Sequence, residues 1–254
     1  DEELMKRLDI RIAGIHSLCY THGTKEENTH GMMQAIRHPY IQIISHPGDG
    51  TALLDFEPMV LASKECGTLL EINNSSLKPT RNKVDARDNN LEILRLCKRY
   101  EVPVILGSDA HISFDIANYE HLYPLLQETE FPEELIVNRS VELFKKQLKK
   151  KSTKTARQEA KQLKKEGWKN APGTLPLDKQ LDNSYAMQQE HTNNFESKYL
   201  MGHASSVART YDAARMQAME LAKMELASMI ETTISSETEN AITNKLYSYK
   251  AIKE

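Results

Sequence analysis

The stretch VILGSDAH at residues 104–111 decides how this chain is interpreted. Three large apolar residues lead to Gly107, and Asp109 and His111 then follow two positions apart. A strand buried on both faces of a parallel sheet is apolar throughout, so its polar residues gather where it leaves the sheet. The stretch predicts a buried strand that delivers a carboxylate and an imidazole to one pocket. Taken alone, an Asp-x-His pair is more often a loop in which Asp caps a helix and His faces solvent.

Three earlier apolar runs also end in polar residues. They are DIRIAGIH, which ends at His16, IQIIS before His46, and TLLEI before Asn73 and Asn74. The runs recur about every 30 residues with a helix-like segment between them, which is the βαβ signature of a parallel sheet. In α/β barrels the catalytic groups lie at the carboxyl ends of the strands. We therefore expect these polar side chains to meet at one edge of a sheet.

Helix signals separate the strands. Thr24 and Glu27 form a capping-box pattern before residues 25–37. Residues 56–66 carry an apolar stripe that stops at Gly67, a residue type that commonly ends helices. A further helix is expected over 86–100. Beyond the last strand, the pattern predicts one helix over 115–128, a strand or extended segment over 134–138 and a closing helix.

The composition of the chain excludes few classes of protein. The chain has 254 residues, 39% hydrophobic and 27% charged, with a net charge of −3, so it can bury one large core or two small ones. Its three cysteines are far apart and odd in number, as expected of reduced thiols. No run is long enough to span a membrane, and the start lacks the order of a signal peptide. We expect a cytoplasmic protein.

The chain changes character after about residue 145. Residues 145–165 hold ten Lys or Arg and one acidic residue, which is typical of a solvated helix face or a linker. Since no aromatics are interleaved, we do not expect nucleic-acid binding. Apolar residues from Val207 to Met229 recur at three- and four-residue steps and predict an amphipathic helix of about 25 residues. The expected domains are 1–150, a basic linker with a Gly/Pro loop at 151–177, and a mainly helical domain at 178–254.

Histidine and carboxylate ligands on rigid strand ends suit zinc, and also manganese or iron. A metal held in this way can generate hydroxide from bound water near neutral pH and stabilise charge on a phosphoryl oxygen. Hydrolysis is therefore the natural reaction class for the first half of the chain.

Four motifs in series carry a family resemblance: RIAGIH at 11–16, IISHPGDG at 43–50, EINNSS at 71–76 and LGSDAH at 106–111. Residues 5–150 resemble the C-terminal half of a PHP (polymerase and histidinol phosphatase) domain, and most closely the small stand-alone PHP phosphatases with a trinuclear zinc site. The resemblance implies part of a distorted seven-stranded α/β barrel. It also implies a metal-dependent phosphatase that hydrolyses a small phosphate ester.

The resemblance also implies roles for particular residues. Four would be metal ligands, with His16 and His46 on one ion, Asp109 on another and His111 on a third. Three would be substrate-binding residues: Asn73, Asn74 and Arg81.

The chain departs from the family pattern at its start. The H-x-H motif on the family's first strand and its metal-bridging glutamate have no counterpart here. About four of seven strands cannot close a barrel and leave sheet edges unpaired. We therefore expect an incomplete metal site in the chain as given.

A second hypothesis comes from another class of protein. Residues 155–254 faintly resemble a small domain of bacterial envelope lipoproteins. In this alternative the protein is a non-catalytic scaffold that associates, with itself or a partner, through the helical C-terminal region.

Overall fold

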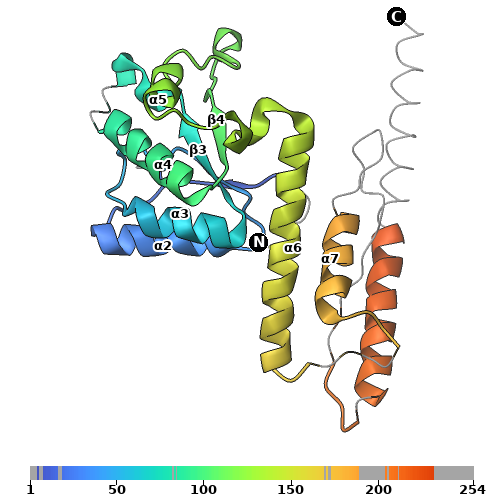
Figure 1. The fold of residues 1–254 in the computed structure, drawn as a ribbon. Coiled ribbons are helices and arrows are strands. Elements are labelled where there is room, and N and C mark those ends of the chain that lie inside the picture. The colour runs from blue at the N-terminus through green and yellow to red at the C-terminus, as the bar shows by residue number, and fades with distance from the viewer. Residues whose placement is uncertain are drawn as a thin grey trace, which may run out of the picture. The chain divides into compact units, whose positions relative to one another are not determined.

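A four-stranded parallel sheet organises the first part of the chain (Figure 1). Its order is β1-β2-β3-β4, with strands Ile12–Ala13, Ile43–Ile44, Leu69–Asn73 and Val104–Gly107. Ile44 pairs with Leu70, and Leu70 pairs with Val104 on its other side. Because successive strands are parallel neighbours, each connection must cross back over the sheet, which confirms the predicted βαβ arrangement.

This computed structural model describes part of the chain. The described residues are 5, 8–16, 19–81, 83, 85–168, 170, 173–188, 204, 206–210 and 212–231, with the backbone alone at residue 81. The chain divides into two compact units, Asp1–Ala186 and Met187–Glu254.

Three helices connect the strands: α2 at Lys25–Arg37, α3 at Phe56–Cys66 and α4 at Ala86–Tyr100. All three follow the predicted bounds. Helix α3 packs against both α2 and α4. The capping box is present at α2, where Thr24 accepts a hydrogen bond from Glu27 N and Glu27 accepts one from Thr24 N. Gly67 ends α3 with φ 79°, a left-handed conformation that costs glycine little.

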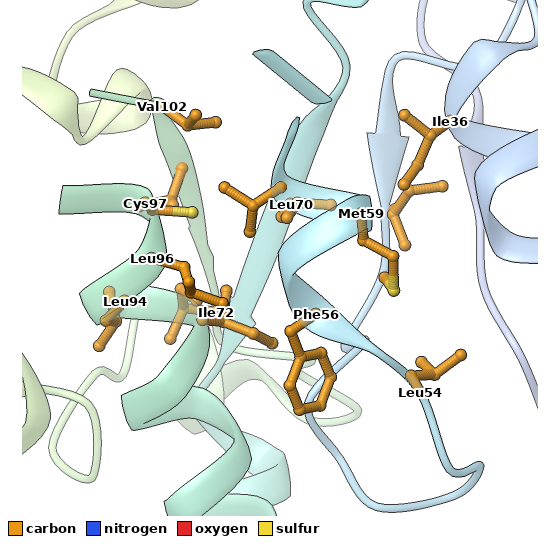
Figure 2. Packing of buried hydrophobic residues seen from close by; sticks show 14 of the residues in the cluster. Ile36, Leu54, Phe56, Met59, Leu70, Ile72, Leu94, Leu96, Cys97 and Val102 are labelled. Atoms are coloured by element: carbon orange, nitrogen blue, oxygen red, sulfur yellow. The ribbon is translucent and has the colours of Figure 1, made fainter. Parts of the chain in front are cut away.

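The core lies between these helices and the sheet. Figure 2 shows side chains of α2, α3, α4 and β3 in this cluster, among them Ile36, Met59, Leu70 and Leu94. These four are fully buried. Burying one such side chain contributes about 1.5–3 kcal/mol relative to exposing it. The core therefore holds the short strands in register and fixes the directions in which their ends point.

The segment after β4 differs from the sequence prediction. Residues 115–128 do not form one helix. A 3-10 turn at Ser113–Asp115 is followed by α5 at Tyr123–Glu128. Between them Ala117 is left-handed with φ 57°, which no continuous helix allows. Residues 134–138 are mostly 3-10 turns, and Ile136 makes an isolated parallel bridge to Val104.

The basic segment is a continuous helix. Helix α6 spans Val141–Lys165 and begins at Ser140, whose hydroxyl accepts a hydrogen bond from Leu143 N. Residues 151–165, expected to begin a linker, thus extend this helix. Its buried residues are Gln147, Lys151, Thr155, Ala156 and Ala160.

Helix α7, at Leu177–Gln188, is tied to α6 by a 2.9 Å hydrogen bond from Thr153 Oγ1 to Asp182 Oδ1. The first compact unit therefore reaches Ala186. The domain boundary expected at residue 178 falls inside it.

In the second unit, residues 212–231 form a helix, which overlaps the predicted amphipathic stretch from Val207 to Met229 but starts later, since residues 207–210 are not helical. Tyr211 lies outside the described residues. Among the helices that the structure describes, none has the length and apolar character that crossing a membrane requires.

Candidate functional site

A cavity of about 340 Å³ opens where the strands end at their carboxyl side. The four residues predicted to bind metal all line it: His16, His46, Asp109 and His111. They follow β1, β2 and β4, so the parallel sheet brings together side chains that lie up to 95 positions apart in the chain. The ends of β1, β2 and β4 thus border one pocket.

The rings of His16 and His46 lie edge to face. Their centroids are 4.8 Å apart, with an interplanar angle of 63°. Gly14 allows the two strand ends to approach, since a Cβ atom there would clash with the Ser45 side chain and lie 3.4 Å from His16 Cε1. Two imidazoles at this separation are close enough to serve one small ligand.

The backbone of His46 adopts a conformation that residues with side chains seldom populate. Its φ is 32°, in the left-handed region. Its N–H donates a 2.8 Å hydrogen bond to Glu71 Oε2, which holds this conformation from the neighbouring strand. The hydrogen bond with Asp49 raises the pKa of the His46 imidazole above its ordinary value, although burial acts in the opposite direction.

Asp49 lies beside the ring of His46, with Oδ2 3.3 Å from Nδ1. The carboxylate also accepts hydrogen bonds from Thr51 N at 2.8 Å, from Thr51 Oγ1 at 2.6 Å and from Lys83 Nζ. Burial alone would raise its pKa, but the hydrogen bonds from His46, Lys83 and Thr51 hold the pKa of Asp49 well below its usual range. Asp49 is therefore a fixed negative charge at the cavity wall.

Glu71 lies between the ends of β2 and β4. A Cβ atom at Gly107 would be 2.6 Å from Glu71 Cδ and closer still to Oε1, so the missing side chain at 107 is what makes room for the carboxylate. Burial raises the pKa of Glu71 above its ordinary value. The nearby charge of Asp109 acts in the same direction.

Asp109 and His111 form the outer wall. Asp109 is left-handed with φ 50°. His111 Nδ1 lies 2.9 Å from the backbone oxygen of Asp109 and 4.0 Å from its Oδ1. Left-handed backbone at a residue other than glycine costs on the order of 1–3 kcal/mol and concentrates at functional sites. Among the described residues, five residues other than glycine are left-handed, and two of them, His46 and Asp109, line this cavity.

The predicted substrate-binding residues are placed differently. Asn73 and Asn74 are fully buried and do not line the cavity. Asn73 Oδ1 accepts hydrogen bonds from Ser76 N and Oγ, and Asn74 Oδ1 accepts from His121 N and Leu122 N. Asn73 therefore holds the turn that carries Ser75 and Ser76, which line the cavity, and Asn74 holds the segment before α5. The side chain of Arg81 lies outside the described residues.

The donor types fit a metal ion, but their number does not complete a site. Imidazole and carboxylate suit zinc, manganese or iron. Within the part of the chain that the structure describes, no three His, Cys, Asp or Glu side chains converge closely enough to hold one ion. No chemical step is therefore assigned to a metal here.

Comparison with known proteins yields several similar bacterial proteins, each named a probable phosphatase. The chain is 41% identical over 137 residues to one from Clostridium novyi (54% of this chain, 55% of the relative). It is 46% identical over 143 residues to one from Caldicellulosiruptor bescii (56% and 58%), and 37% identical over 156 residues to one from Acetivibrio thermocellus (61% and 64%). The chain thus spans between half and two thirds of the length of these relatives. No family model matches it.

Sequence reasoning missed Asp49, Glu71 and Lys83. Glu71 had a visible signal, since it is the one charged residue in the apolar run 68–72. Asp49 follows His46 by three positions, a turn spacing. Lys83 carried no local signal, because only the tertiary structure brings it to Asp49.

Proposed function

We propose that this protein is a PHP-type, metal-dependent phosphoesterase that acts on a small phosphate ester. The observation that carries the proposal is the placement of His16, His46, Asp109 and His111 around one cavity at the carboxyl ends of parallel strands. The names of its relatives, probable phosphatases at 36–46% identity, support the same reaction class.

The residues of the cavity suit a phosphate ester. Lys83 supplies a cation, and the hydroxyl of Ser75 can donate a hydrogen bond to a phosphoryl oxygen. A bound divalent ion would add Lewis-acid stabilisation of charge on the transferred group. Zinc, manganese and iron all remain candidates under this proposal, and so does a multinuclear site.

The proposal includes an incomplete ligand set. Three donors do not converge among the described residues, and the relatives are longer than the matched region. We propose that a complete site combines the four donors of this cavity with donors from protein beyond that match.

The test measures metal and activity separately. The purified chain is titrated with Zn²⁺ and Mn²⁺, and bound metal is quantified for wild type, H46Q, D109N and the control H30Q, which alters an exposed histidine of α2. The same variants are made in a fusion that adds the unmatched part of the Caldicellulosiruptor bescii relative. Phosphate release from a panel of small phosphomonoesters is then followed.

We expect H46Q and D109N to weaken metal binding and H30Q to leave it unchanged. We also expect the fusion to release phosphate. A metal-loaded fusion that hydrolyses no phosphomonoester would overturn the proposed activity.

A second candidate function rests on the helix over 212–231. Met216, Met219, Leu221 and Met224 expose between 43% and 70% of their surface in the described part of this unit. Exposed apolar patches often mark association surfaces. If the protein is a scaffold, sedimentation velocity should show self-association that D109N leaves intact and that L221E with M224E abolishes. A monomer at all concentrations would remove this candidate.

A further inference from the structure

We propose that Asp49 is the positioning residue for His46: its carboxylate holds the ring through Nδ1, so that Nε2 is left to meet a ligand in the cavity. This proposal deepens the proposed function. It rests on that function only for the measurement of metal affinity, and not for the measurement of the His46 tautomer.

The contact itself is sheltered from solvent. His46 Nδ1 lies 3.3 Å from Asp49 Oδ2, and their side chains are 16% and 5% exposed. An imidazole that donates from Nδ1 to a carboxylate has its tautomer fixed, with the lone pair on Nε2. The same bond fixes the plane of the ring.

A tight turn places the carboxylate beside Nδ1 of the ring. Asp49 N donates a 3.1 Å hydrogen bond to His46 O, which closes the turn His46-Pro47-Gly48-Asp49. Asn90 of α4 holds the tip of this turn, since its Nδ2 donates to Gly48 O at 3.3 Å. A Cβ atom on Gly48 would lie 2.9 Å from that nitrogen, so a residue with a side chain would displace the turn from α4.

Asp49 is itself immobilised. Its Oδ1 accepts from Thr51 N, and its Oδ2 is shared by Thr51 Oγ1, Lys83 Nζ and His46 Nδ1. Three donors share the two lone pairs of Oδ2 and one donor uses Oδ1, so most of the roughly four lone-pair sites of the carboxylate are taken. Asp49 therefore has little capacity left to bind a metal or substrate directly. Its position suits a residue that orients the neighbouring histidine.

The alternative is that Asp49 only closes a turn and neutralises Lys83. That role would need the contacts to Thr51 and Lys83 and would leave the tautomer of His46 undetermined. The two roles therefore differ in what they predict for the imidazole nitrogens.

The experiment reads the tautomer directly. Long-range ¹H–¹⁵N correlation spectra of the full chain, at a pH alkaline enough to keep the imidazole neutral, distinguish a proton on Nδ1 from one on Nε2. The signal of His46 is assigned by its loss in H46Q. The variants are D49A, its matched control D55A, which truncates an exposed aspartate before α3, and K83M.

We expect His46 to carry its proton on Nδ1 in wild type, D55A and K83M, and to lose this preference in D49A. If D49A does not fold, wild type and K83M still decide the matter. A proton on Nε2 in wild type would overturn the proposal. Loss of the preference in K83M, with Asp49 still present, would overturn it as well.

The second arm titrates Zn²⁺ against a competing chelator. D49A should weaken Zn²⁺ binding about 10–100-fold, the usual effect of removing a carboxylate behind a ligating histidine, and D55A should not. If the tautomer results are as expected but neither wild type nor the fusion that completes the proposed ligand set binds Zn²⁺, the positioning role stands and the proposed metal function fails. If D49A changes neither tautomer nor affinity, the positioning role is refuted.

Discussion

At the scale of single residues, Gly107 and Glu71 show how a buried carboxylate is accommodated. Glu71 occupies the space that a side chain at 107 would fill. The carboxylate in turn accepts the N–H of His46 and keeps that residue left-handed. A small residue on β4 thereby controls the position of a histidine that follows β2.

Replacing Gly107 with alanine should destabilise the protein. The new methyl group would overlap Glu71, and overpacking of this kind costs about 1–3 kcal/mol. Urea unfolding followed by circular dichroism measures the loss. In an E71A background the same replacement should cost much less, because the overlapping atoms are gone.

G31A is the control: Gly31 lies in an exposed part of α2, so alanine there should stabilise the protein by about 0.5–1 kcal/mol. Equal costs of G107A in the two backgrounds would contradict this explanation.

Lys151 is a second residue with an unusual environment. It is 3% exposed, and its Nζ donates to Ile36 O and His38 O at 3.2 Å and to Thr68 Oγ1 at 2.8 Å. Two of these acceptors are carbonyls at the C-terminal end of α2, where the helix dipole favours a cation. Burial nevertheless lowers the pKa of Lys151 to about 8.

This shift predicts a pH dependence. Below pH 8 the lysine is protonated in both states, and folding must bury the charge. Between pH 8 and 10.5 the folded state loses its proton while the unfolded state keeps it, so the free energy of unfolding should rise with pH. The rise attributable to Lys151 is on the order of 3 kcal/mol.

The measurement compares urea unfolding of wild type, K151M and the exposed control K149M at pH 7.5, 9 and 10.5. The difference between wild type and K151M should shift in favour of wild type as the pH increases. The difference between wild type and K149M should stay constant. A wild-type to K151M difference that is independent of pH would show that the lysine keeps an ordinary proton affinity.

At the scale of elements, helix boundaries follow local chemistry closely. The capping box of α2 and the left-handed Gly67 after α3 were both predicted, because a cap involves residues only a few positions apart. Elements that depend on distant contacts were predicted less well. Residues 115–128 are interrupted where Asn74, from the end of β3, binds the backbone of His121 and Leu122.

Removing the cap should weaken α2 measurably. T24A deletes the acceptor for Glu27 N and should lower the free energy of unfolding by about 1 kcal/mol. D55A provides the comparison, since Asp55 occupies the same position before α3 but makes no capping hydrogen bond through its side chain. Thermal and urea unfolding should rank T24A as the more destabilised variant. The opposite order would contradict the capping interpretation.

At the scale of the whole molecule, the core cluster between the helices and the sheet belongs to the first compact unit. Its buried members run from Met32 to Phe131. Helix α6 adds two buried polar contacts to this unit. Gln147 Nε2 donates to Gly67 O at 3.0 Å, and Lys151 Nζ donates to Ile36 O at 3.2 Å. The cavity and its four predicted ligands lie in the same unit.

A chain that ends after Ala186 should therefore fold by itself. Its urea midpoint and cooperativity should stay close to those of the full chain, because the core cluster is retained. A second chain that ends after residue 150 is the contrast. It lacks Lys151 and the rest of α6, and should be clearly less stable. A chain ending after Ala186 that is clearly less stable than the full chain would contradict the boundary at Ala186, and equal stability of the two truncations would show that residues 151–186 do not stabilise the first unit.

The sequence by itself determined the strand and helix alternation, the caps and the four strand-end residues that line the cavity. These depend on hydrophobic period and on local turn chemistry, which are written in short stretches of chain. The tertiary structure alone decided that Lys83 reaches Asp49, that Glu71 fills the space above Gly107, and that a basic segment buries Lys151 against α2. Each of these contacts joins residues that are far apart in the sequence and meet only in the folded protein. The periodicity of apolar residues along the chain does not indicate which distant side chains will meet.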